Sequence, residues 1–352
     1  MMKDVLIVGQ GISGTFLSWY LEKAGLSFLI IDEDRPHTAS RAAAGLINPV
    51  TGRRIVKTWM IDELLSFAQQ AYRDIGKALQ LDPLRTVDLI DFFPTAQMRL
   101  AFLQRQEEDP QYLQLPGDEH AWDHSFRYDL GYGMITSCYI ADLPILLPAS
   151  RQRLQQKGAL LDEHFDRSLL IIEAGHIRYK DITARMIIFC DGIESFNNPW
   201  FSRLPFAPNK GEVLVLEAPE LTITNTVFKK GMTLAPWKDG LYWVGSSYEW
   251  SFANPDPTPA FKQKTGALLR DWLKTPFSIV DHIASVRPAT LERRPFVGFH
   301  PLHPNVGILN GMGTKGCSLA PYFAHQLVEH ITGNKPIRAD ADVRRFSKIL
   351  SK

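Results

Sequence analysis

Three glycines near the amino terminus have the spacing of a dinucleotide-binding turn. Gly9, Gly11 and Gly14 follow a short apolar stretch, 5–8, and precede a segment with apolar residues at helical spacing. Such glycines allow a tight turn, a close approach of the backbone to a pyrophosphate and close packing of a helix on a strand. Asp32 directly follows the next apolar stretch, where a carboxylate would accept hydrogen bonds from ribose hydroxyls. The pattern therefore predicts a dinucleotide site.

The same order of strand, glycine-rich turn and helix occurs near the other end of the chain. A strand predicted over 306–310 leads into the turn 311–316 and then into a helix predicted from 318 to 332. A nicotinamide enzyme would normally need only the first module for its cofactor, whereas two modules favour the longer cofactor FAD. The start of the second helix would bring positive potential and N–H groups to the electron-poor pyrimidine edge of the flavin.

The composition is that of an ordinary globular protein of about two domains. The chain has 352 residues, of which 45% are hydrophobic and 22% charged, and a domain has about 150 residues. Its 39 Lys and Arg residues balance 38 Asp and Glu residues. The net charge therefore gives no indication of a nucleic-acid partner or an anionic membrane, and the ligand must be sought in a site.

The sequence is typical of a cytoplasmic protein. Its first apolar stretch breaks at Gly9, which is too early for a signal peptide, and no apolar run is long enough for a membrane span. Cys138, Cys190 and Cys317 are scattered and odd in number, which suits reduced thiols. The ten histidines show no metal-binding spacing, so we predict no metal site.

Between the two glycine turns, helical and strand patterns alternate. Helical spacing is found over 59–79 and 144–157, and a strand is predicted at 186–190. Segment 211–248 alternates as antiparallel strands do, with turn residues between the strands. The stretch 83–131 shows no clean period. We therefore expect an α/β domain and a second domain rich in antiparallel sheet.

Four segments carry a family resemblance. They are the GQGISG turn with Asp32, the loop SRAAAGLINP at 40–49, the run VRPATLERRPFVG at 286–298 and the turn GMGTKGCSLAP at 311–321. Together they resemble the D-amino-acid oxidase and glycine oxidase superfamily of FAD-dependent oxidoreductases. The resemblance implies an α/β fold, with a Rossmann-like FAD-binding domain of the glutathione-reductase type and a mostly antiparallel α+β substrate domain. It assigns residues 1–85, 140–205 and 281–352 to the FAD-binding domain, and 86–139 and 206–280 to the substrate domain.

The resemblance also assigns roles to single residues. The family's RPxTxDxxPxIG pattern carries the arginine that binds the substrate carboxylate, and this arginine falls on Arg287. A guanidinium group can bind a carboxylate through two charge-assisted hydrogen bonds. Lys315 would lie at the flavin edge or else face solvent, and Arg293 with Arg294 would form a solvated or structural pair. The cofactor-binding residues implied are Gly9, Gly11, Gly14, Asp32, Ala43, Ala44, Gly45, Leu46, Gly192, Gly311, Gly313, Thr314, Lys315 and Gly316.

Departures from the family pattern affect the cofactor. After its middle strand the family has an Ala-Ala-Gly or Ala-Thr-Gly turn, whereas this chain has Cys190, Asp191 and Gly192. Asp191 either places a charge near FAD or caps the next helix. No cysteine precedes Arg287 where monomeric sarcosine oxidases bind flavin covalently, so we predict non-covalent FAD. The lysine thought to activate oxygen in those oxidases has no counterpart on strand 241–245, so the acceptor is oxygen or another electron acceptor.

The predicted reaction is oxidation of the C–N bond of a small amino acid or secondary amine by hydride transfer to flavin N5. The aromatic residues of segment 237–248 either wall the amine pocket or pack in the core. One alternative is an oxidase acting on a carboxymethylaminomethyl-type modified tRNA base. A basic stripe from Arg41, Arg53 and Arg54 to the flavin would favour it, although the near-neutral net charge argues against a nucleic-acid partner. The other alternative is a non-catalytic flavin-binding protein.

Overall fold

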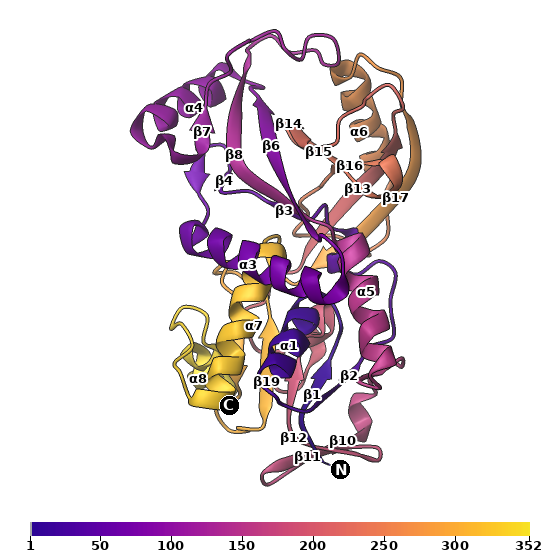
Figure 1. Ribbon diagram of the computed structural model, residues 1–352, viewed down its shortest axis with the longest axis vertical. Coiled ribbons are helices and arrows are strands. Elements are labelled where there is room, and N and C mark those ends of the chain that lie inside the picture. The colour runs from indigo at the N-terminus through magenta and orange to yellow at the C-terminus, as the bar shows by residue number, and fades with distance from the viewer. Residues whose placement is uncertain (1) are drawn as a thin grey trace.

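An eight-stranded sheet carries both glycine-rich turns at one edge. The computed structural model describes residues 2–352, and this sheet fills its lower half in Figure 1. Five neighbouring strands run parallel, in the order β9 (Leu160–Leu161), β2 (Phe28–Ile31), β1 (Lys3–Val8), β12 (Ile182–Phe189) and β19 (Val306–Asn310). Antiparallel strands complete the sheet, namely β10 (Leu170–Glu173), β11 (His176–Tyr179) and β18 (Phe296–Phe299).

Helices pack on one face of this sheet. They are α1 (Ile12–Lys23), α3 (Ile61–Leu79), α5 (Leu143–Gln156) and α7 (Gly316–Gly333). In α3 the apolar residues at i, i+3, i+4 and i+7 from Ile61 are buried, which is the pattern of a helix with one face in a core. Tyr72 of α3 packs edge-on against Phe16 of α1, and its hydroxyl donates to the carbonyl oxygen of Cys317. These contacts hold the starts of α1 and α7 in fixed positions.

A nine-stranded, mostly antiparallel sheet forms the upper half of the molecule (Figure 1). Its strands are, in spatial order, β17 (Ser278–Arg287), β13 (Asn209–Glu217), β16 (Tyr242–Gly245), β15 (Met232–Pro236), β14 (Thr226–Lys230), β6 (Leu84–Phe92), β8 (Tyr132–Ala141) and β3 (Leu46–Ile47), with β7 (Leu113–Gln114) on β8. Smaller elements are α2 (Ala39–Ala42), α4 (Ala96–Glu108), α6 (Pro259–Trp272), α8 (Ser347–Leu350) and the hairpin of β4 (Val50–Thr51) and β5 (Val56–Lys57).

The two faces of β13 meet different surroundings because side chains alternate along a strand. Val213 packs in the core that also contains the helices of the first sheet, whereas Leu214 and Leu216 pack with Trp272 of α6. The indole N–H of Trp243 on β16 donates to the carbonyl oxygen of Ala42 at 2.9 Å. The inner face of the second sheet is therefore closed onto the first half of the molecule.

A buried charged network fixes β13 to the start of α6. The carboxylate of Glu212, which is fully buried, lies 3.2 Å from the Lys210 ammonium and 2.9 Å from the His282 ring. The backbone N–H and hydroxyl of Thr258, the residue before α6, also donate to it. Burial alone would raise the pKa of Glu212, but the Thr258 hydrogen bonds and the Lys210 charge lower it below its usual value.

This architecture confirms the predicted fold class. The predicted helices and strands at 59–79, 144–157, 186–190 and 306–310 are present with ends shifted by a few residues, and the helix expected from 318 begins at Gly316. The stretch 83–131 contains β6 and α4, which its irregular pattern did not reveal. The domain boundaries stay a prediction. Within residues 2–352 we find no helix with the length and apolar character of a membrane span.

Candidate active site

The first glycine turn leaves the start of α1 open. A methyl group on Gly14 would stand 2.0 Å from the carbonyl oxygen of Gly9, so the turn closes this tightly only with glycine. The N–H of Ile12 donates to the Ser40 hydroxyl at 3.1 Å. The N–H groups of Ser13 and Gly14 have no acceptor within residues 2–352. Such unpaired N–H groups at the positive end of a helix dipole form an anion site.

The second glycine turn lies directly beside the first. A methyl group on Gly316 would stand 3.3 Å from the Ile12 side chain, so the starts of α7 and α1 are adjacent. The N–H of Gly313 donates to the carbonyl oxygen of Pro288 at 3.2 Å. In the described part of the chain, the N–H groups of Gly316 and Cys317 have no acceptor. Two adjacent helix starts fit FAD, with the pyrophosphate at α1 and the flavin edge at α7.

Asp32 stands at the end of β2 with its carboxylate oriented by neighbours. Its Oδ2 accepts from the N–H of Gln10 at 2.8 Å, and its Oδ1 accepts from Nη1 of Arg151 at 2.7 Å. Arg151 comes from α5, is buried, and also pairs with Asp162 at 2.8 Å. Sequence analysis missed Arg151 because nothing near it in the chain indicates that α5 points this side chain at the end of β2.

The loop with the predicted flavin contacts begins beside the start of α1. Ser40, which accepts from Ile12, belongs to α2, and Ala43 to Leu46 follow it. Ala44 is buried, and Leu46 begins β3, which pairs with β8. The loop thus runs from the first glycine turn to the second sheet.

The turn after β12 contains Gly192 and the unusual Asp191. The Ser195 hydroxyl and the Asn310 amide both donate to Asp191 Oδ1. Burial raises the pKa of Asp191 to about 6, while the Ser195 hydrogen bond acts in the opposite direction. These contacts join the short helical turn Gly192–Asn197 to the end of β19, but the Asp191 side chain accepts from no backbone N–H of that turn, so both predicted roles stay open.

Arg287 ends β17 without an acidic partner. Its Nη2 donates to the Ser246 hydroxyl at 2.6 Å, and its Nη atoms also contact the side-chain oxygen of Asn209 and the carbonyl oxygen of Ser247. Within residues 2–352, no carboxylate is close enough to form an ion pair with it. Burial lowers the pKa of Arg287, yet a guanidinium stays charged at neutral pH. A partly buried cation with only neutral partners fits an anionic ligand.

Neighbouring residues on β13 shape the space for this guanidinium. Asn209 lies opposite Arg287 in the sheet register, and its own amide nitrogen is buried without a partner. A methyl group on Gly211 would stand 1.9 Å from Nη2 of Arg287, so the guanidinium occupies the space that a larger side chain would take. Sequence analysis missed Asn209, Ser246 and Gly211, since they are far from Arg287 in the chain.

Tyr248 connects Arg287 to the second glycine turn. The guanidinium carbon lies 4.9 Å from the centre of the Tyr248 ring, and the Tyr248 hydroxyl lies 3.2 Å from Oγ1 of Thr314. Tyr248 is 55% exposed, whereas Tyr242 and Trp243 of β16 are buried in the cores. Of these three aromatic residues, Tyr248 is therefore the one available to a ligand.

Lys315 precedes α7 and faces other cations. Burial lowers its pKa to about 8, and the charges of Arg293 and Arg294 lower it further. The Arg294 guanidinium lies on the face of Trp59, 4.0 Å from the ring centre. The carboxyl edge of the parallel strands therefore carries the two glycine turns, the 43–46 loop, Gly192 and Lys315. Arg287 is linked to this edge through Tyr248.

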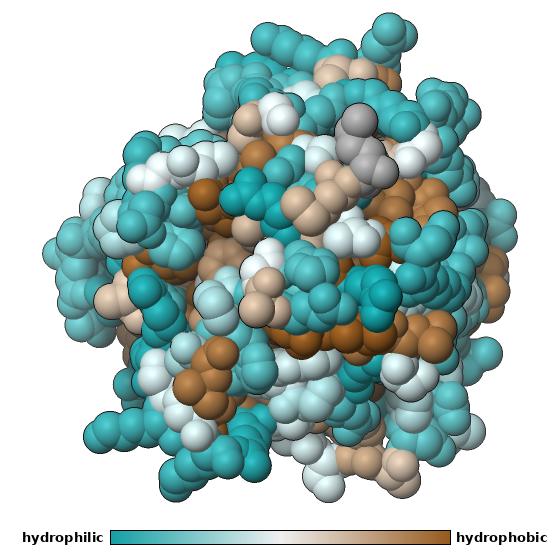
Figure 2. Space-filling view, turned by 90° about the horizontal axis from the view of Figure 1, so that it is seen from below, coloured by the Kyte–Doolittle hydropathy of each residue, from teal (hydrophilic) through white to brown (hydrophobic). Residues whose placement is uncertain are grey.

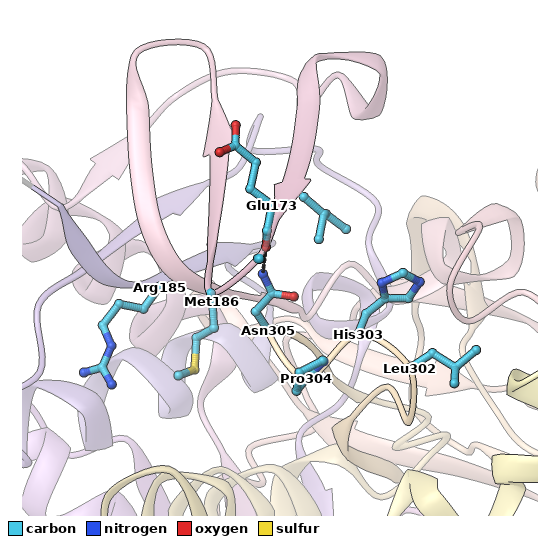
Figure 3. A pocket seen from close by; sticks show the side chains of 10 residues that line it. Glu173, Arg185, Met186, Leu302, His303, Pro304 and Asn305 are labelled. Atoms are coloured by element: carbon cyan, nitrogen blue, oxygen red, sulfur yellow. Dashed lines mark hydrogen bonds between the residues drawn. The ribbon is translucent and has the colours of Figure 1, made fainter.

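A surface cavity of about 630 Å³ lies at the opposite edge of the first sheet. It is lined by the β10–β11 turn, by Arg185 and Met186 of β12 and by the loop before β19 (Figure 3). The Asn305 amide, which donates to the carbonyl oxygen of Glu173 at 3.2 Å, lies at its centre. At this end of the molecule, apolar side chains occupy hollows between hydrophilic ones (Figure 2). Open α/β sheets bind ligands at the carboxyl ends of their strands, so this cavity is not the candidate site.

Fold and site together define a dinucleotide-binding oxidoreductase. The family model for FAD-dependent oxidoreductases matches residues 4–330, and the chain belongs to this family. The family assignment confirms the predicted resemblance, the enzyme class and FAD as cofactor.

Relatives cover nearly the whole chain at low identity. A glycine oxidase of Pseudomonas putida is 24% identical over 96% of both chains. The tRNA 5-methylaminomethyl-2-thiouridine biosynthesis bifunctional protein of Marinobacter nauticus is 24% identical over 93% of this chain, which spans 55% of that protein. Among solved structures, the iminodiacetate oxidase of Chelativorans sp. BNC1 has a TM-score of 0.78 at 19% identity, covering 96% of this chain and 98% of the other.

Proposed function

We propose that the protein oxidises the C–N bond of a small amino acid or secondary amine that carries a carboxylate. The observation that carries this proposal is Arg287, a partly buried cation held by neutral oxygens beside the second glycine turn. Relatives named glycine oxidase support an amino-acid substrate. The roles of the residues named below rest on the same proposal.

Arg287 binds the substrate carboxylate in this reaction. Its hydrogen bonds to Asn209, Ser246 and Ser247 orient the guanidinium, so that it donates to the carboxylate in one geometry. The Tyr248 ring lies against one face of the guanidinium and limits the directions from which a ligand can reach it. The amine is bound in neutral form, because removal from water lowers its pKa.

FAD, when bound, supplies a hydride acceptor at flavin N5 for the hydrogen that leaves the substrate α-carbon. The free N–H groups at the start of α7 and the Lys315 ammonium provide positive potential where negative charge develops. Water then hydrolyses the imine product. Non-covalent binding is supported by Cys317, whose buried thiol has a pKa raised to about 12 and is thus a poor nucleophile. A cytoplasmic location and the electron acceptor stay predictions.

An anaerobic spectrum tests the proposal. We expect the flavin band of the FAD-loaded protein to bleach when glycine, sarcosine, proline or D-amino acids are added, and to bleach at least tenfold more slowly in Arg287→Met. Arg185→Met, which replaces an arginine of the distant cavity, serves as the matched control. A flavin band that persists with every amine would contradict the proposal and favour a non-catalytic flavoprotein.

A second candidate is oxidation of a modified tRNA base. Arg53 and Arg54 are exposed on the β4–β5 hairpin, which ends beside Trp59, the ring beneath Arg294. In the described part of the chain, none of these arginines is paired with an acid, whereas Arg41 is paired with Asp34. Arg53, Arg54 and Arg294 are therefore available to a phosphate backbone, which supports this candidate. The Marinobacter relative supports the same candidate.

Binding of labelled tRNA distinguishes the candidates. Salt-sensitive binding that weakens in Arg53→Gln and Arg54→Gln, together with bleaching of the flavin by tRNA carrying the modified base, would favour the second candidate. Bleaching by a free amino acid without tRNA binding would favour the first.

A further inference from the structure

Three cations gather at the second glycine turn. We call Arg293, Arg294 and Lys315 the cationic cluster. Arg294 donates to the carbonyl oxygen of Arg293 and lies flat on Trp59. Within residues 2–352, no carboxylate pairs with any of the three, and the two arginines lower the pKa of Lys315 further than burial alone.

Two acids near the cluster, Glu292 in sequence and Asp340 through Arg338 on Trp59, are already paired with other cations. Glu292 accepts from Arg345 at 3.2 Å, and Asp340 accepts from Arg338 at 3.2 Å. Arg338 also lies over Trp59, 5.8 Å from the ring centre. Two arginines thus contact the same indole, but only Arg338 is paired with an acid. The repulsion within the cationic cluster is therefore not offset by the protein, and an anion would offset it.

The cluster adjoins the substrate arginine through the same turn. The segment from Arg287 to Arg293 runs past the second glycine turn, where the carbonyl oxygen of Pro288 accepts from Gly313. Lys315 follows Thr314, and Thr314 contacts Tyr248, which covers Arg287. Arg287 and the cationic cluster thus both adjoin the second glycine turn.

We infer that the cationic cluster binds a second anionic group of the substrate, in addition to the carboxylate at Arg287. This inference rests on the proposed function and narrows its substrate class to amines with two anionic groups. The second group is a carboxylate or a phosphate, since both accept several charge-assisted hydrogen bonds from arginine. Glycine and sarcosine, which have one carboxylate each, would then be oxidised more slowly than amines with two anionic groups.

Equilibrium binding of ligands that cannot be oxidised tests this inference. The FAD-loaded protein is titrated with propanoate, succinate and 3-phosphonopropanoate, and the dissociation constant is measured from the shift of the flavin spectrum. We expect one of the two dianions to bind about tenfold or more tightly than propanoate. The dianion that binds more tightly identifies the second group as carboxylate or phosphate.

Variants assign the preference to the cluster. In the double variant Arg293→Gln with Arg294→Gln, we expect dianion binding to weaken about tenfold and propanoate binding to change less than threefold. Arg294→Lys retains the charge and should retain most of the preference. Arg338→Gln is the matched control. It removes an arginine that contacts the same indole but is already paired with an acid. Thermal melting checks that each variant is folded.

Several outcomes would overturn the inference. Equal affinity for propanoate and both dianions would do so, as would equal weakening of all three ligands in the double variant. A cluster that affects only the binding of an RNA oligonucleotide would instead be a surface for a polyanion. If no carboxylate shifts the flavin spectrum, the proposed function fails as well. If propanoate binds and the dianions show no advantage, only the inference fails.

Discussion

The two halves of the candidate site recognise ligands by different means. At the first sheet, the open starts of α1 and α7 offer backbone N–H groups and glycines without side chains, which would meet the cofactor in the proposed site. At the second sheet, the Arg287 side chain is placed by Asn209 and Ser246 from other segments. Backbone recognition depends on local sequence, whereas side-chain recognition depends on contacts between remote segments. Single substitutions should therefore impair one half without the other.

The largest effect is expected from Glu212→Ala in the charged network beneath Arg287. Removing this carboxylate leaves Lys210 buried without its partner, and breaking a buried pair in this way costs about 3–5 kcal/mol. Urea unfolding should show this loss in the free energy of unfolding. Lys210→Met combined with Glu212→Leu removes both charges and should recover most of it. A loss below 1 kcal/mol in the single variant would show that the network is not needed for stability.

Gly14→Ala should impair the cofactor half most. Its methyl group would stand 2.0 Å from the Gly9 carbonyl oxygen, which is backbone and cannot move aside cheaply. We expect the dissociation constant for FAD to rise about 100-fold, equivalent to about 3 kcal/mol. Quenching of flavin fluorescence on binding measures it. Gly333→Ala, where nothing lies within 4 Å of the added methyl, is the control. Unchanged FAD affinity would contradict a close fit at this turn.

Gly211→Ala is the counterpart in the substrate half. The added methyl would stand 1.9 Å from the Arg287 guanidinium, the far end of a flexible side chain, which must shift. We expect kcat/KM to fall about 10- to 100-fold, which corresponds to about 1.4–2.7 kcal/mol. The dissociation constant for FAD should stay within about threefold. Steady-state kinetics and flavin titration measure the two separately, and Gly117→Ala is the control. An equally large rise in the dissociation constant for FAD would contradict the proposed independence of the two halves.

The same contrast explains what the sequence could predict. The glycine turns, Asp32 and the position of Arg287 follow from short motifs, because each motif sets a local backbone shape or ends a strand. Arg151 on Asp32 and Asn209 on Arg287 could not be predicted, since each contact joins segments far apart in the chain. The two interpretations of Asp191 stay open, because its carboxylate accepts from the side chains of Ser195 and Asn310 and not from the backbone of the turn that follows.

The smallest effect is expected from Lys315→Met, at the junction of the two halves. With a pKa lowered to about 8, the Lys315 ammonium is charged at pH 7 and loses its charge as the pH rises through that value. A cation near the flavin favours reduction, so the reduction potential of the wild type should exceed that of the variant by about 30 mV at pH 7, or about 1.4 kcal/mol for a two-electron couple.

The difference between the two potentials should shrink above pH 8 and vanish near pH 10, because the wild type has then lost the charge that the variant never had. Anaerobic dye titration at several pH values measures it, and subtracting the variant removes the pH dependence common to both proteins. Lys315→Arg should keep the difference at high pH, since arginine stays charged there. A difference independent of pH would mean that Lys315 acts through packing. If the two reduction potentials are equal at every pH, Lys315 does not act on the flavin. Its charge would then contribute to the cationic cluster alone.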